Sequence, residues 1–152
     1  ILMKPNTYYG KAKKKLYIEL EKLKKKNSFN LTWVRIFYTY GNNQKSKSLF
    51  SQIKLEEKNN TKSFDLTEGK QLRDYLHVNI LAKKILLLSF LKKDIGIINV
   101  CSGNPISIKK LVLSWKKKYK WKIRFNFGNK NLKTYEPLNF WGSIKKLRKV
   151  LN

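Results

Sequence analysis

The residues best suited to chemistry in this sequence are Tyr9 and Lys13, which stand four positions apart near its beginning. Residues with this spacing share one face of an α-helix, so a single ligand can contact both side chains. A free tyrosine titrates near about 10 and is a poor base at neutral pH, but a nearby ammonium favours the charged phenolate. Such a pair can exchange a proton with a sugar hydroxyl or carbonyl. Because the chain is rich in lysine, the spacing also arises by chance and alone indicates little.

Other catalytic and metal-binding arrangements are poorly supported. The chain has one histidine, one cysteine and nine carboxylates, too few and too scattered for a metal site, which needs converging ligands. His77 lies among apolar neighbours, and we interpret it as a packing residue. Neither Gly-x-Gly-x-x-Gly nor Gly-x-x-x-x-Gly-Lys occurs, so the sequence shows no loop for nucleotide phosphates.

The formal net charge of +26 is of the kind that attracts polyanions such as nucleic acid. Proteins that read nucleic-acid sequence rely on arginine, whose planar fork matches phosphates and base edges. Here nearly all cations are lysines spread along the chain, and the abundance of Lys, Asn and Ile fits an A/T-rich coding sequence. We therefore expect only non-specific, salt-sensitive attraction to nucleic acid. Arginine occurs only at positions 35, 73, 124 and 148.

The length of 152 residues is that of about one domain. A single cysteine, Cys101, excludes an internal disulfide and indicates a reducing, cytoplasmic setting. The longest apolar run, 80–91, contains Lys83 and Lys84 and is too short to span a membrane. The sequence does not begin with methionine, from which we expect an upstream part.

Helical and extended patterns alternate along the chain, which predicts an α/β fold with parallel strands. Ser107 and Ser143 are the expected N-caps of the last two helices. Helices are predicted over 7–26, 48–58, 80–91, 107–115 and 143–151; strands over 31–38, 63–66, 75–78, 96–100 and 123–127; and an irregular segment over 135–139.

Five blocks place the Tyr9–Lys13 pair in a wider context. Residues 5–13 read PNTYYGKAK and fit the pattern Pro-x-(Ser/Thr)-x-Tyr-Gly-x-x-Lys. Further blocks follow as VRIFYTYG (34–41), QLRDYLHV (71–78), INVCSGNPISI (98–108) and FWGSIKKL (140–147). In this order they resemble the extended short-chain dehydrogenase/reductase family of NAD(P)-dependent sugar-nucleotide epimerases, dehydratases and reductases. The details of the second and last blocks most resemble members that reduce or epimerise the 4-keto group of deoxysugar nucleotides.

The resemblance implies the carboxy-terminal part of a Rossmann-type parallel sheet together with the small substrate-binding subdomain. Residues 1–41 and 74–103 would form the Rossmann side, and 42–73 and 104–152 the subdomain. NAD or NADP is the implied cofactor and a nucleotide sugar the implied substrate. Relatives also dimerise through the helix that carries the tyrosine, so a homodimer is possible, although the segment Ala12–Lys26 is strongly cationic.

The resemblance also assigns roles to individual residues. Tyr9 would be the acid/base, and Lys13 its partner and a ligand of the cofactor ribose. Phe37 and Tyr38 would lie near the nicotinamide and the sugar. Arg73 would bind the substrate diphosphate, because a guanidinium donates in a fixed fork; the alternative is a surface ion pair with Asp74 or another carboxylate.

Several features depart from the family pattern. The Gly-rich loop that seats the cofactor pyrophosphate belongs to the family's amino-terminal half, so this chain alone should bind cofactor poorly. Tyr38 replaces the family's usual asparagine. A second phosphate-binding arginine is not identifiable near 135–141, where Lys133 is a weak substitute, and we interpret Asn99 as a loop-supporting residue. Two rival interpretations stay open: a basic nucleic-acid-binding module, and an inactive remnant of the enzyme.

Overall fold

The computed structural model describes residues 4–42, 44–131 and 137–152, and it is a mixed α/β structure with parallel strand pairs. Helix α1 (Tyr8–Lys26) leads into β1 (Thr32–Ile36) and β2 (Tyr38–Tyr40), followed by α2 (Leu49–Lys58) and β3 (Ser63–Leu66). Short strands β4 (Leu72–Arg73) and β5 (Tyr75–His77) precede α3 (Val78–Phe90) and β6 (Gly96–Val100). The chain ends with β7 (Ile106–Ser107), α4 (Ile108–Tyr119), β8 (Arg124–Phe127), β9 (Asn139–Phe140) and α5 (Lys145–Leu151).

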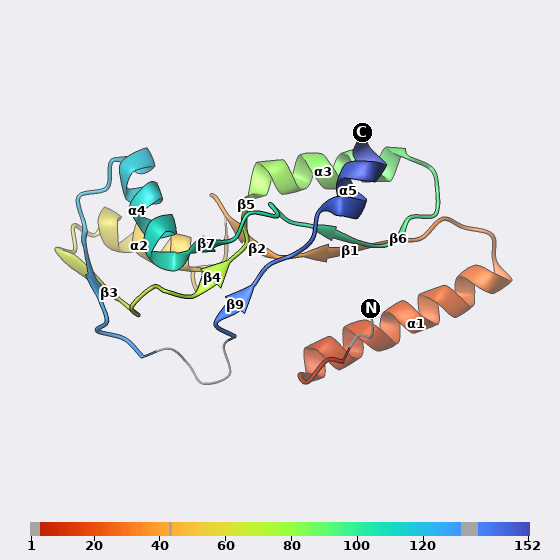
Figure 1. Cartoon of the computed structure of the whole chain (residues 1–152), viewed down its shortest axis with the longest axis horizontal. Helices are drawn as coiled ribbons and strands as arrows, with labels where there is room; N and C mark the ends of the chain where they lie inside the picture. Colours follow the sequence, from red (N-terminus) through yellow and green to blue (C-terminus); the bar gives the residue numbers. More distant parts are fainter. Residues whose placement is uncertain (1–3, 43, 132–136) are drawn as a thin grey trace.

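The strands form four small sheets. β1 pairs with β6, β2 with β5 and β3 with β8, all parallel. β4 lies between antiparallel β7 and parallel β9. In Figure 1 the β1–β6 pair lies between α1 on one side and α3 with α5 on the other, whereas α2, α4, β3 and β8 gather at the opposite end of the molecule.

Two clusters of buried apolar residues correspond to these two ends. The first surrounds Trp115, which is 1% exposed, and joins α2 and α4 to β3; it comprises Phe50, Ile53, Leu66, Ile108, Leu111, Val112, Trp115, Trp121 and Ile123. The second packs α3 and α5 onto β6; it comprises Leu76, Leu81, Leu88, Ile95, Ile98, Val100 and Leu147. Burial of these side chains provides the main stabilisation of each end.

Most predicted elements are present, with two corrections. The strand predicted over 31–38 divides at Phe37 into β1 and β2, because the two parts pair with different strands, β6 and β5. The last helix begins at Lys145 with Ile144 at the N-cap position, so the predicted N-cap Ser143 is wrong by one residue. The Ser143 hydroxyl accepts a hydrogen bond from the Lys145 amide at 3.4 Å. The cap at Ser107 is confirmed, since its hydroxyl accepts a hydrogen bond from the Lys110 amide at 3.2 Å.

Two smaller differences concern the segments before α3 and α5. α3 starts at Val78, directly after β5, where His77 serves as its N-cap. Within the segment predicted to be irregular, Asn139 belongs to strand β9, while residues 135 and 136 lie outside the described part of the chain.

Candidate active site and substrate cavity

The first turn of α1 presents Tyr9 and Lys13 on one face. Thr7 caps the helix, with its hydroxyl accepting from the Gly10 amide at 3.1 Å. The Lys13 ammonium lies 5.6 Å from the centre of the Tyr9 ring. Tyr9 is 74% exposed, so its hydroxyl is accessible to a ligand. The spacing read from the sequence therefore does bring the two side chains together.

Two contacts at the far half of α1 hold it against the rest of the protein. The Tyr17 ring packs on Trp33 of β1, with centroids 5.3 Å apart. The Lys24 ammonium lies 2.7 Å from a carboxylate oxygen of Asp94, whose other oxygen accepts from the Leu31 amide. The hydrogen bond from Lys24 lowers the pKa of Asp94 and raises that of Lys24 itself. These contacts set the position of the helix that carries Tyr9.

A groove of about 1100 Å³ separates α1 from β1 and the segment after β9. Tyr9 and Lys13 line it from the helix, and Arg35 and Phe37 line it from the strand side. Trp141 lines it as well and is half exposed. The groove is thus lined by the predicted catalytic pair and by Phe37, one of the two residues expected near the nicotinamide and the sugar.

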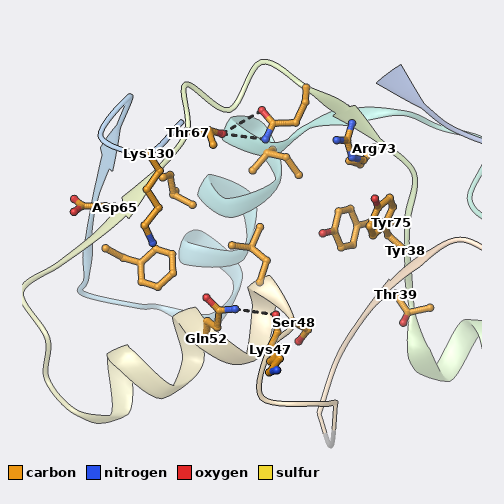
Figure 2. Close-up of a pocket in the computed structure, with 15 residues that line it drawn as sticks. Tyr38, Thr39, Lys47, Ser48, Gln52, Asp65, Thr67, Arg73, Tyr75 and Lys130 are labelled. Carbon is orange, nitrogen blue, oxygen red and sulfur yellow. Dashed lines mark hydrogen bonds between the residues drawn. The ribbon is translucent and has the colours of Figure 1, made fainter. Parts of the chain in front are cut away.

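Tyr38 and Arg73 line a second cavity, of about 410 Å³, on the other side of the β1–β2 junction. Figure 2 shows Arg73, Tyr38 and Tyr75 along one side of this cavity. Phe37 and Tyr38 are adjacent in the sequence but line different hollows: Phe37 lines the groove and Tyr38 lines the second cavity. Both touch Phe140, which stacks on Phe37 at 5.1 Å and meets Tyr38 edge-on at 6.0 Å. Phe140 lines the groove, so this aromatic group lies between the two hollows.

Arg73 is held in a fixed orientation. It is 3% exposed, and its Nη1 donates to the carbonyls of Leu72 and Leu138 at 2.9 and 3.1 Å. Its guanidinium carbon lies 5.8 Å from the centre of the Tyr38 ring. The alternative of a surface ion pair with Asp74 does not fit, because both residues are buried.

Asp74 is a buried residue of the site whose structural role the sequence did not indicate. It is fully buried, and its carboxylate accepts from the amides of Ser102 at 2.7 Å, Gly103 at 2.9 Å and Gly142 at 3.5 Å. It thereby ties the loop after β6 and the segment after β9 to the strand that carries Arg73. Neighbouring Cys101 is also buried, which raises the pKa of its thiol to about 11, so this thiol stays neutral at physiological pH.

The supporting residues agree with their predicted structural roles. His77 accepts from the Asn79 amide at 3.2 Å and meets Tyr40 edge-on at 5.1 Å, as expected of a packing residue. Asn99 donates to the Ser143 carbonyl at 3.3 Å, which joins β6 to the segment before α5. Lys133 lies outside the described residues.

The described part of the chain offers neither a cluster of metal ligands nor a membrane-spanning helix. No group of three or more His, Cys, Asp or Glu side chains there could hold a metal ion. No helix there is long and apolar enough to cross a membrane.

The sequence matches a family model over residues 1–101, which include both blocks that carry Tyr9 and Arg73. The model describes the NAD dependent epimerase/dehydratase family. The chain belongs to this family. Among curated relatives, the dTDP-6-deoxy-L-talose 4-dehydrogenase (NAD(+)) of Aggregatibacter actinomycetemcomitans is 28% identical over 114 residues, which are 75% of this chain and 42% of the relative.

Solved structures of epimerases share the fold. A UDP-N-acetylglucosamine 4-epimerase from Methanobrevibacter ruminantium, bound to UDP-N-acetylmuramic acid, superposes with a TM-score of 0.82 at 20% identity over 97% of this chain. A UDP-glucuronic acid 4-epimerase from Bacillus cereus, bound to UDP-glucuronic acid and NAD, gives 0.79 at 22% identity over 99%. In both cases the match covers 48% of the epimerase, so this chain spans about half the length of these family members.

Proposed function

We propose that this chain supplies the acid/base pair and the substrate diphosphate site of an NAD(P)-dependent nucleotide-sugar epimerase, dehydratase or 4-keto reductase. The main support is the arrangement of the two hollows. The Tyr9–Lys13 pair lines one and Arg73 lines the other, and Phe140, which lines the groove, contacts Tyr38, which lines the cavity. A ligand with a sugar at one end and a diphosphate next to it can extend from the pair to Arg73.

The groove fits the nicotinamide–ribose end of the cofactor. Its donors include the Tyr9 hydroxyl and the Lys13 ammonium, which suit ribose hydroxyls, and Phe37 offers an apolar ring for a nicotinamide. The sequence has no Gly-rich loop for the pyrophosphate. We therefore assign to this chain the ribose and nicotinamide side of the cofactor site only.

The chemistry of this chain's own residues is proton transfer. The hydride chemistry at C4 of the sugar would be supplied by a bound nicotinamide. The Tyr9 hydroxyl would hold or take the proton of the 4-hydroxyl, with the Lys13 ammonium 5.6 Å from the centre of its ring. Arg73 would hold the diphosphate, because its fork is fixed by two backbone carbonyls and by the Tyr38 ring.

The two buried clusters support a different role for each end of the molecule within this assignment. The cluster of α3, α5 and β6 would belong to the carboxy-terminal part of a Rossmann-type sheet, and the cluster around Trp115 to the substrate-binding subdomain. Helix α5 lies in the range 104–152 that was expected to belong to the subdomain, but its Leu147 is buried with residues of α3 and β6. The cavity that Arg73 lines is also lined by residues of α2 and β3, and these two elements carry part of the cluster around Trp115. Substrate specificity is then a property of this end of the molecule.

Replacement of the tyrosine tests the catalytic assignment. In a protein that also carries the family's amino-terminal half, Tyr9→Phe removes the hydroxyl and should lower turnover of a nucleotide sugar by at least about a hundredfold, while affinity for the nucleotide sugar stays unchanged. Turnover is followed by nicotinamide absorbance and product analysis. Tyr8→Phe is the matched control, because Tyr8 is 93% exposed and does not line the groove.

Two results would contradict the proposal. Wild-type turnover in Tyr9→Phe would show that another group moves the proton. A wild-type protein that also carries the family's amino-terminal half, and that binds nucleotide sugar and cofactor but never turns the sugar over, would favour the inactive remnant.

A further inference from the structure

We propose that the outer face of helix α3 is a docking surface for an anionic lipid bilayer, to which the protein attaches without crossing it. The centre of this surface is the α3 patch, which consists of the exposed apolar side chains Ile80, Leu86, Leu87 and Phe90. The inference does not depend on the proposed function, because the patch belongs to the side of the β1–β6 pair that lies away from α1 (Figure 1).

Helix α3 carries more apolar surface than the core of the protein covers. Its buried residues are Leu81 and Leu88, which lie seven positions apart on one face. Phe90 is 69% exposed, and the other three members of the α3 patch are exposed as well. Spacings of three, four and seven positions gather the patch on the side of the helix that points away from the buried pair. A contiguous apolar surface of this kind marks a place where another body docks.

Cations share this side of the sheet with the α3 patch. Lys83 is exposed and lies within the patch, at helical spacing from its members. Helix α5 packs on the same side of β6 (Figure 1) and exposes Lys145, Arg148 and Lys149. Neither α3 nor α5 contains an aspartate or a glutamate. None of the ion pairs found in the described residues involves these four cations, so the charge of this face is uncompensated.

The α3 patch lies away from the edge at which a larger sheet would continue. Strand β1 pairs with β6, and in the described part of the chain its other edge pairs with no strand. A hollow of about 260 Å³ beside that edge is lined by Thr32, Val34, Ile85 and Leu88. No member of the patch lines this hollow. Strands added next to β1 would therefore leave the patch in contact with solvent.

The combination of apolar and cationic side chains selects the occupant. An anionic bilayer attracts cations at its headgroups and receives apolar side chains at the boundary of its acyl region. Lys83 can lay its alkyl stem along the patch while its ammonium stays at the headgroups. A second copy would bring two cationic faces together, which the net charge of +26 on each chain opposes. A nucleic acid attracts the cations through its phosphates but gains nothing from burial of Phe90.

Sedimentation of the 152-residue chain with lipid vesicles tests the proposal at about 0.15 M salt, where screening reduces non-specific attraction. The vesicles contain phosphatidylcholine alone or phosphatidylcholine mixed with phosphatidylglycerol. We expect binding to the mixed vesicles to be at least about tenfold tighter than to the neutral ones. Phe90→Ser should weaken binding to the mixed vesicles at least about fivefold, because the aromatic ring no longer enters the interface. Since Phe90 is exposed, the variant should keep the urea midpoint of the wild type.

Matched controls separate the α3 patch from other exposed apolar side chains. Leu113→Ser on α4 and Leu23→Ser on α1 change side chains that are also exposed, and each should alter binding less than about twofold. A polarity-sensitive fluorophore attached to Phe90→Cys should shift its emission to shorter wavelength on the mixed vesicles, and one attached to Leu113→Cys should not. The native thiol, Cys101, is buried and does not compete for the label.

Several results would overturn the inference. Equal binding of Phe90→Ser and the wild type would reduce the contact to charge alone. A loss in Leu23→Ser as large as that in Phe90→Ser would assign the contact to α1. Equal binding to neutral and mixed vesicles would remove the role of the cations, and a lipid-free dimer that Phe90→Ser converts to a monomer would assign the patch to a second copy. The proposed function is unaffected by each of these results, because turnover tests it separately.

Discussion

Arg73 and Phe140 are direct register partners in the parallel strands β4 and β9, although they are far apart in the sequence. The Asp74 amide donates to the Phe140 carbonyl at 3.2 Å and reinforces this pairing. The residue proposed to bind the diphosphate is thus paired with the aromatic residue that lines the groove and contacts Tyr38 of the cavity. A change that moves the segment after β9 should affect both hollows together.

Gly142 offers a steric test of this attachment. A β-carbon there would stand 2.6 Å from Cζ of Phe37 and 2.7 Å from Sγ of Cys101. Gly142→Ala should therefore lower the free energy of unfolding by about 1–3 kcal/mol, as overpacking does, measured by urea denaturation. Ser143→Ala, at the exposed next position, should change it by less than about 0.5 kcal/mol. Equal stability of the two variants would show that the segment moves freely.

The buried carboxylate of Asp74 provides an electrostatic test. In Asp74→Asn an amide group replaces an oxygen that faces backbone donors, so the free energy of unfolding should fall by about 2 kcal/mol or more. Burial raises the pKa of the Cys101 thiol, and the Asp74 charge adds to that effect. The variant should therefore also lower the Cys101 pKa below about 11, which a thiol titration measures.

The matched control for this change is Glu68→Gln, an exposed carboxylate paired with Lys70. It should leave both the urea midpoint and the thiol titration unchanged. A Cys101 pKa that is the same in Asp74→Asn and the wild type would contradict the electrostatic argument.

The hydrogen-bond partners of Asp74 could not be predicted from the sequence. Its neighbour Arg73 suggested an ion pair, but the actual donors are amides 28, 29 and 68 positions away. Backbone donors carry no residue-type signature, and only the fold brings them together. The same limit applies to Phe140, which was seen as part of a block but not as a contact of Phe37.

Local features were predictable for physical reasons that act within a few residues. The Tyr9–Lys13 contact follows from helical spacing alone, and the Ser107 cap from the preference of serine for that position. The division of the strand at Phe37 was missed because periodicity reports side-chain alternation and not the partner strand. The hydrogen bond from the Lys130 amide to the Leu66 carbonyl was missed for a similar reason, since it depends on the pairing of β3 with β8.

The attachment of α1 should depend on pH through Asp94. Because its pKa is lowered in the folded protein, the stabilisation it gives is present above the ordinary aspartate value and is lost as the pH falls through the lowered value. The amide signal of Leu31, which donates to Asp94, should shift over that acidic range in an NMR titration. Asp94→Asn should remove the step, and a step that persists in the variant would assign it to another group.

Binding to DNA should be weak and governed by salt. Of the four arginines, Arg73 is buried in the cavity and cannot reach base edges, so the remaining attraction comes mainly from dispersed lysines. Affinity for a duplex should fall roughly a hundredfold or more between about 50 and 200 mM salt, and a scrambled duplex should bind equally well in the same fluorescence titration. The salt slope counts the phosphates that the lysines neutralise. A shallow slope together with tight, sequence-selective binding at physiological salt would instead support the nucleic-acid-binding module as the function.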